Sequence, residues 1–144
     1  MANPKLPKLT HVLNLRAHMS RDGGVAGKQR NGATRYLAPL TGGFLQGVAG
    51  TKAEGLNVEI MPGGSDWLLV DETTKIAHLD VRTHGKTPEG HGFFIYYTGY
   101  LGSDDIGQKF RTWQPDAVTS RGGDHHWWTN PTFETSGKHT NPHL

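Results

Sequence analysis

Apolar and polar residues alternate along several short stretches of this chain, which is the pattern of a β-strand with one buried face. The clearest example is residues 76–84, where Ala77, Leu79 and Val81 fall on one side of an extended segment. A strand over residues 76–83 is therefore expected, with its apolar side in the core. The opposite side of this strand consists of His78, Asp80, Arg82 and His84.

Turn-forming residues divide the rest of the chain into further short segments of the same kind. Pro62-Gly63-Gly64 is a strong turn signal, and Thr41-Gly42-Gly43 indicates a bend or bulge. Long helical periodicity is absent, and residues 109–113 form a short strand or one helical turn. Short strands at regular spacing favour a barrel or a sandwich over a layered α/β fold. The expected strands cover residues 9–17, 34–40, 44–48, 56–61, 66–70, 76–83, 93–100 and 127–133.

Glycine and proline are abundant, and this abundance supports the all-β interpretation. The chain has 20 Gly and 8 Pro in 144 residues, and in a helix interior each Gly costs about 1 kcal/mol and each Pro about 3 kcal/mol. The length suits one ordinary domain, and neither a linker nor an internal repeat divides it. We therefore expect a single domain over residues 1–144, with a polar tail from about residue 136.

Charge and cysteine content narrow the class of protein. The net charge is only +2, and the basic residues are scattered along the chain, so no nucleic-acid partner is expected. No segment is long and apolar enough for a secretory signal or a membrane span, so no membrane association is expected. The absence of cysteine excludes disulfides and thiolate metal sites and fits a reducing compartment, which favours a cytoplasmic location.

A carboxylate and a large indole, Asp66 and Trp67, stand where the Pro-Gly-Gly turn passes into the next strand. If a three-residue loop joins the strands over residues 66–70 and 76–83, Asp66 lies opposite Arg82. Two interpretations of the polar side of the second strand stay open. In one it is a solvated outer face. In the other it faces a cavity, where Asp66 and Arg82 form a charge pair that orients or deprotonates a substrate.

The segment 93–98 places aromatic side chains on both faces of the expected strand, so neither face is expected to be solvent-exposed. One side is expected to pack in the core. The other lines a ligand pocket, with Tyr97 as a contact, or joins two copies of the chain as a homodimer.

Nine histidines raise the question of a metal site. The densest group, His125-His126, points to opposite faces of an extended strand, and no metal-binding spacing of histidines occurs. None of the Gly-Gly turns has the context of a phosphate loop, and no Gly-x-Ser-x-Gly elbow is present. The sequence therefore predicts no metal and no cofactor.

Four motifs carry a resemblance to a known family. They are Arg35 with Pro-Leu-Thr-Gly-Gly-Phe at 39–44 and Gly47, Pro-Gly-Gly-Ser-Asp-Trp at 62–67, Leu-Asp-Val-Arg-Thr at 79–83, and Phe-Glu-Thr at 133–135. On these motifs the chain resembles the DUF3237 family, also called the UPF0311 proteins, from about residue 9 to residue 137.

The resemblance implies a compact antiparallel β-barrel, lipocalin-like and with little helix, and a role in small-molecule or secondary metabolism. The recurrence of Arg35, Asp66 and Arg82 in the family motifs favours the cavity interpretation. Three departures stand out. Thr83 replaces the usual Tyr, Trp128 stands where the family has an Arg-Thr pair, and the chain ends before the family's last apolar strand, so barrel closure is expected to be incomplete or supplied otherwise.

These observations support three functions from different classes. The favoured one is a cofactor-independent isomerase, cyclase or lyase that acts by acid/base chemistry on an aromatic or polyketide-like substrate inside the barrel. The alternatives are a non-catalytic binding or carrier protein and an assembly module. In the enzyme, Asp66 or Glu134 is the general base, and Arg35 and Arg82 stabilise a developing oxyanion. The candidate residues are Asp66, Arg82 and Glu134 for catalysis, and Arg35, Trp67, Tyr97 and Phe133 for substrate binding.

Overall fold

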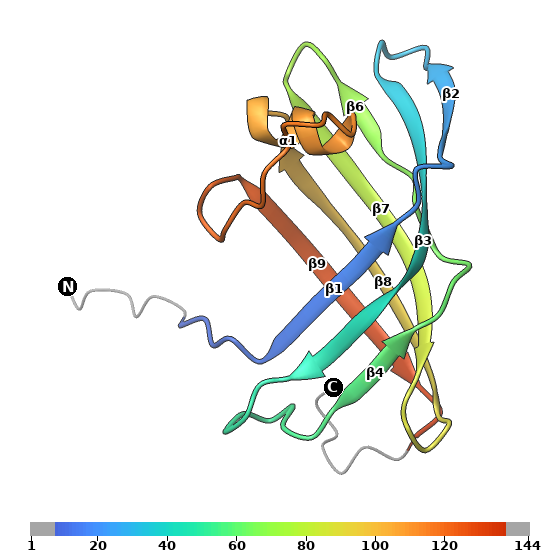
Figure 1. Cartoon of the computed structure of the whole chain (residues 1–144), viewed down its shortest axis with the longest axis vertical. Coiled ribbons are helices and arrows are strands. Elements are labelled where there is room, and N and C mark those ends of the chain that lie inside the picture. The colour runs from blue at the N-terminus through green and yellow to red at the C-terminus, as the bar shows by residue number, and fades with distance from the viewer. Residues whose placement is uncertain (1–7, 138–144) are drawn as a thin grey trace, which may run out of the picture.

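A strongly curved antiparallel sheet and one short helix make up residues 8–137, the part of the chain that the computed structural model describes (Figure 1). The sheet curls into a lipocalin-like β-barrel, which confirms the fold class predicted from the sequence. Its elements are β1 (Leu13–Met19), β2 (Gly24–Lys28), β3 (Thr34–Gly47), β4 (Asn57–Ile60), β5 (Ser65–Asp66), β6 (Leu69–Asp71), β7 (Ile76–Lys86), β8 (Gly92–Gly102), α1 (Asp105–Arg111) and β9 (Trp127–Thr135).

The order of strands in the sheet is β1-β3-β4-β7-β8-β9, with β2 added beside β3. The two short strands β5 and β6 lie between β3 and β7 and pair with both. Within residues 8–137 no backbone ladder joins β1 to β9, which are the two ends of this order. Side chains of both strands line the cavity described below, so the barrel interior lies between them.

One long strand, β3, replaces the two strands expected over residues 34–40 and 44–48. The predicted bulge is present, because the pairing of β1 with β3 shifts between His18 and Met19. A Cβ on Gly43 would lie 2.0 Å from the carbonyl oxygen of Arg16, and its φ of +134° disfavours other residues. The glycines therefore bend the strand without ending it.

The predicted register between the strands that carry Asp66 and Arg82 is wrong by one residue. Asp66 pairs with Val81, and Arg82 pairs with Ser65. The turn explains the difference, because four residues separate the paired Asp71 and Ile76 at the start of β7. The carboxylate of Asp71 accepts hydrogen bonds from the backbone N–H groups of Thr73 and Thr74, and Lys75 adopts a φ of +58°.

Alternation in β7 places Ala77, Leu79, Val81 and Thr83 inside the barrel and His78, Arg82 and His84 outside. Ala77, Leu79 and Val81 are buried. The solvated interpretation of the polar side is therefore correct, and the cavity interpretation, which needed Arg82 inside, is wrong. The interior holds two apolar clusters. One consists of Ala38, Leu68, Val70, Ala77, Leu79 and Leu101, and the other of Leu45, Leu56, Val58, Ile60, Phe93 and Ile95.

Two elements differ from the sequence-based expectation. No element was expected between the strand over residues 93–100 and residue 109, yet α1 begins at Asp105, where the side chain of Asp104 caps it by accepting a hydrogen bond from the N–H of Gly107. The strand β2 also lies outside the expected strands, because glycines flank and interrupt it. Within residues 8–137 no helix has the length and hydrophobicity needed to cross a membrane.

Candidate functional site

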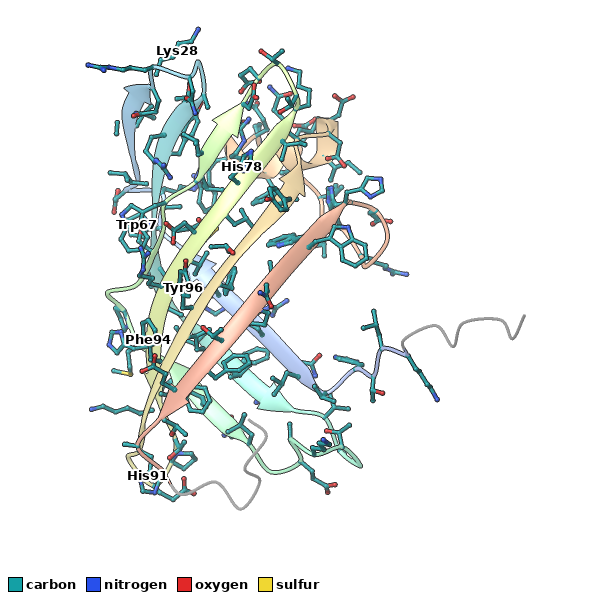
Figure 2. The ribbon with its side chains drawn as sticks, turned by 180° about the vertical axis from the view of Figure 1, so that it is seen from behind. Lys28, Trp67, His78, His91, Phe94 and Tyr96 are labelled. Atoms are coloured by element: carbon teal, nitrogen blue, oxygen red, sulfur yellow. The ribbon has the colours of Figure 1, made fainter. Side chains whose placement is uncertain are left out.

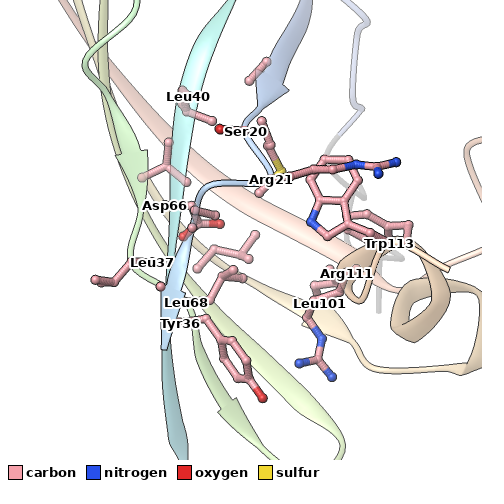
Figure 3. A pocket seen from close by; sticks show the side chains of 18 of the residues that line it. Ser20, Arg21, Tyr36, Leu37, Leu40, Asp66, Leu68, Leu101, Arg111 and Trp113 are labelled. Carbon is pink, nitrogen blue, oxygen red and sulfur yellow. The ribbon is translucent and has the colours of Figure 1, made fainter. Parts of the chain in front are cut away.

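A cavity of about 520 Å³ occupies the end of the barrel beside α1 (Figure 3). Strands β1, β2, β3, β5, β7, β8 and β9 all contribute to its walls, and the β1–β2 loop and the end of α1 complete it. The lining is mostly apolar. Its charged members are Asp66, Arg21 and Arg111, and its aromatic members are Tyr36, Tyr97, Phe110, Trp113 and Trp127.

Asp66 lies in a row of paired residues that crosses the inner wall of the barrel. The row runs from Ala38 on β3 through Asp66 on β5 and Val81 on β7 to Tyr97 on β8. All four residues line the cavity. Because neighbouring strands lie about 4.8 Å apart, the backbones at Asp66 and Tyr97 are about 10 Å apart. This is a span that one flat ring system bridges.

The backbone around Asp66 fixes the direction of its side chain. The strand is interrupted after Asp66, where the N–H of Trp67 donates to the carbonyl of Asp80 at 3.0 Å. The N–H of Asp80 donates in turn to Oδ1 of Asp66 at 3.1 Å. Gly64 is needed just before, because a Cβ there would lie 2.5 Å from the Thr83 hydroxyl. The Pro-Gly-Gly-Ser-Asp-Trp motif therefore turns the carboxyl group inward at a break in the strand.

Burial raises the pKa of Asp66 from its ordinary value of 3.8 to about 6. The hydrogen bond from the Asp80 N–H and the charge of Arg35 oppose this rise, whereas the charge of the Asp80 carboxylate adds to it. The side chain is only 6% exposed. Within residues 8–137 no ion pair neutralises this carboxyl group, which explains why desolvation dominates.

Tyr97 contributes a phenol to the same wall. Burial, followed by the nearby charge of Asp66, raises its pKa to about 12. The hydroxyl group therefore stays protonated across the physiological pH range and is a hydrogen-bond donor from about pH 6, where Asp66 ionises, to about pH 12. The sequence placed Tyr97 in a pocket, and it is a cavity residue in the structure.

Three other candidates, Arg35, Trp67 and Arg82, lie outside the cavity lining. The Arg82 guanidinium stacks over the rings of Trp67 and Tyr96, at 5.6 Å and 5.0 Å from their centroids, on the polar side of β7. It also lies 3.3 Å from the carboxylate of Asp80. The side chains of Trp67 and Tyr96 are labelled in Figure 2. Arg35 donates a hydrogen bond to the carbonyl oxygen of Trp67 and supports the strand break. The predicted charge pair inside the barrel does not form, because the register shift turns Arg82 outward.

The two candidates on β9 are separated by the alternation of that strand. Phe133 pairs with Ile95 and packs into the second apolar cluster, where its ring lies 6.0 Å from that of Phe93. It is an interior residue but does not line the cavity. Glu134 pairs with the outward-facing Phe94 and is exposed. A general base at Glu134 would therefore face solvent.

Sequence reasoning missed the cavity residues that come from the β1–β2 loop and from α1. Arg21 stacks over the ring of Trp113 at 5.1 Å, and Arg111 stacks over the ring of Tyr36 at 5.2 Å. All four residues line the cavity (Figure 3). They are distant from Asp66 in the sequence and follow no common period, so only the folded chain brings them together.

The histidines do not form a metal site within residues 8–137, where no three potential ligands gather. In the adjacent pair His125-His126, Nδ1 of His125 lies 2.8 Å from the Asp104 carboxylate, just before the start of α1. Asp104 also caps the helix, so this contact has a structural explanation.

Comparison with known proteins places the chain in a family. The family model described as "Protein of unknown function (DUF3237)" matches residues 7–142. The chain belongs to the DUF3237 family. No functionally curated protein matches the sequence.

Solved structures similar to this DUF3237 protein share its fold at low sequence identity. A conserved protein of unknown function from Rhodopseudomonas palustris is 20% identical, with a TM-score of 0.72 over 92% of this chain and 81% of that chain. A protein of unknown function from Clostridium acetobutylicum is 21% identical, with a TM-score of 0.63 over 88% and 76%. A "beta-barrel like protein" from Acinetobacter baumannii is 20% identical, with a TM-score of 0.58 over 96% and 82%.

Proposed function

We propose that this protein is a cofactor-independent enzyme that moves a proton on a flat, largely apolar small molecule held in the barrel. The observation that carries the proposal is the carboxyl group of Asp66, which lines an apolar cavity and has its pKa raised to about 6. A general base works best when its pKa lies near the working pH, and enzymes raise carboxyl pKa values by burial for this purpose.

The proton transfer follows from the positions of Asp66 and Tyr97. The Asp66 carboxylate removes a proton from the carbon next to a substrate carbonyl, and negative charge develops on the carbonyl oxygen. The Tyr97 hydroxyl donates a hydrogen bond to that oxygen, because its pKa of about 12 keeps it protonated. Return of the proton from Asp66 to another carbon gives an isomer with no net change in atoms or charge.

Tyr97 thus takes the role that sequence reasoning gave to Arg35 and Arg82. The reaction class remains acid/base chemistry on an aromatic or polyketide-like substrate, and isomerisation is the form in which Asp66 returns the proton that it removed. Residues of the first apolar cluster and the aromatic rings of the lining supply the contacts to the substrate body.

The test is deuterium exchange of 2-tetralone, a flat bicyclic ketone with acidic protons beside its carbonyl. In D₂O at pH 7.5, ¹H NMR follows loss of the proton signals with the wild type, Asp66→Asn and Glu134→Gln. We expect Asp66→Asn to lower the exchange rate about 10²- to 10⁴-fold, the usual contribution of a general base. Glu134→Gln is the matched control, a carboxylate on the outer face, and is expected to exchange like the wild type.

The same experiment weighs a second candidate, a binding or carrier protein, which the mostly apolar lining favours. Binding of 2-tetralone is measured in parallel by quenching of tryptophan fluorescence. Binding without catalysed exchange would support the carrier. Equal exchange rates in the wild type and Asp66→Asn would overturn the role of Asp66, and absence of binding would exclude this class of ligand.

A further inference from the structure

Two guanidinium groups stand on the α1 side of the cavity, and the proposed proton transfer uses neither. Arg111 is the last residue of α1, and Arg21 belongs to the loop between β1 and β2. Both line the cavity together with Asp66 (Figure 3). The charged part of the lining therefore has two cations and one carboxyl group.

Arg111 is a buried cation whose charge is only partly balanced. Its side chain is 9% exposed, and its nearest carboxylate oxygen, on Glu72, lies 3.7 Å away. Glu72 is half exposed and shares its charge with Lys75, which lies 3.2 Å from its other oxygen. The Ser103 hydroxyl, at 3.5 Å, is a further polar partner. A guanidinium has five N–H donors, more than these contacts use.

Arg21 is held by an aromatic ring rather than by an acid. Within residues 8–137 no carboxylate lies at ion-pair distance from its guanidinium, which stacks on Trp113 instead. Stacking leaves the edge of the guanidinium plane, where the donors lie, available to a ligand.

Trp113 itself is in a strained position. It follows α1 with a φ of +56°, where helices usually have glycine. Its N–H donates to the carbonyl of Phe110, and the next N–H, of Gln114, donates to the carbonyl of Lys109. A left-handed conformation is unfavourable for a residue that has a side chain. The residue held in this conformation lines the cavity and supports Arg21.

We propose that the cavity selects ligands that carry a carboxylate, which pairs with Arg111 while the apolar body extends toward Asp66. Arg21, held apart on Trp113, adds a second positive charge to the lining. This inference rests on the proposed function, because it assumes the same cavity. The planar fork of arginine matches a carboxylate with two parallel hydrogen bonds. A singly charged carboxylate also loses less hydration than a doubly charged phosphate on entering a mostly apolar site.

The test compares two probes of equal shape, 2-naphthylacetic acid and 2-naphthylacetamide, by isothermal titration calorimetry at pH 7.5. We expect the wild type to bind the acid at least tenfold more tightly than the amide. Arg111→Gln is expected to weaken binding of the acid about tenfold, Arg21→Gln to weaken it about threefold, and both to leave binding of the amide unchanged. Arg16→Gln, which removes an exposed charge outside the cavity lining, is the control and is expected to bind both probes like the wild type.

The outcomes separate this inference from the proposed function. Equal affinity of the wild type for acid and amide would overturn carboxylate selection and leave the proposed function standing. Binding of neither probe would count against the cavity as the site of function. Retention of the full acid preference in Arg111→Gln would overturn the pairing with this arginine. Arg21 is exposed and tolerates substitution, so unchanged affinity for the acid in Arg21→Gln would overturn the contribution of its charge.

Discussion

Inside the barrel, the strands β5, β7 and β8 present Asp66, Val81 and Tyr97, and on the outer side the same region presents Arg82 and Tyr96. The inner carboxyl group lies among apolar side chains, and its pKa rises to about 6. The outer guanidinium is half exposed, stacks on aromatic rings and pairs with Asp80. Neighbouring positions in the strands thus meet very different environments.

The comparison teaches that one residue of register decides which side chains share a site. In the register expected from the sequence, Asp66 and Arg82 face each other, and the charge pair would keep the pKa of Asp66 low. In the observed register the arginine lies outside, and desolvation controls the carboxyl group. A raised pKa suits a general base at neutral pH, whereas a paired carboxylate is a weaker base.

The largest expected effect on stability comes from removing the inner charge with Asp66→Asn. Because the folded-state pKa of about 6 exceeds the ordinary value of 3.8, the folded state binds more protons than the unfolded state between these pH values. The free energy of unfolding therefore falls as pH rises from about 4 to 6, and above pH 6 the ionised group costs about 3 kcal/mol.

Asparagine keeps an oxygen acceptor for the N–H of Asp80 and carries no charge. In urea unfolding at pH 7.5 we expect Asp66→Asn to be about 2 to 3 kcal/mol more stable than the wild type, a difference that disappears near pH 4. A variant less stable than the wild type at pH 7.5 would show that the carboxylate is stabilised rather than strained.

The next effect is on activity and compares the two tyrosines. Tyr97→Phe removes the proposed donor to the substrate oxygen, so we expect the exchange rate of 2-tetralone to fall about 100-fold. Tyr96→Phe is the outer counterpart and is expected to leave the rate unchanged, because the Tyr96 ring contacts Arg82 on the outer side. Equal losses in both variants would indicate a general structural effect.

The smallest effect is expected from Arg82→Gln. Each exposed ion pair or cation–π contact contributes about 1 kcal/mol or less, so the loss of these three contacts should lower the free energy of unfolding in urea by about 1 to 2 kcal/mol. Exchange of 2-tetralone should be unaffected. A loss of exchange comparable to that of Asp66→Asn would restore the catalytic role that the sequence suggested for Arg82.

Much of the fold follows from the sequence because strand alternation is local. The faces of β7 are readable from Ala77, Leu79 and Val81, and the β-barrel from the spacing of strands and turns together with the family motifs. The register in which β5 and β6 pair with β7 is harder to predict from the sequence, because it depends on the length of one turn. That turn is set by hydrogen bonds of the Asp71 side chain and by the left-handed conformation of Lys75.

The site was only partly predictable for a related reason. Asp66 and Tyr97 were identified because a motif and an aromatic strand mark them. Arg21, Arg111 and Trp113 reach the cavity from a loop and a helix end, where no periodic pattern indicates direction. Glu134 was placed wrongly with respect to the interior, because adjacent residues of β9 face opposite sides and its neighbour Phe133 takes the inner one.

The central claim is that Asp66 is a desolvated carboxyl group with no ionic partner within residues 8–137, and its titration tests this most directly. In ¹³C NMR of aspartate-labelled protein, the Asp66 side-chain carboxyl resonance, assigned by its absence in Asp66→Asn, is followed from pH 3 to pH 9. The account predicts a midpoint near pH 6. A midpoint at or below 4 would contradict it.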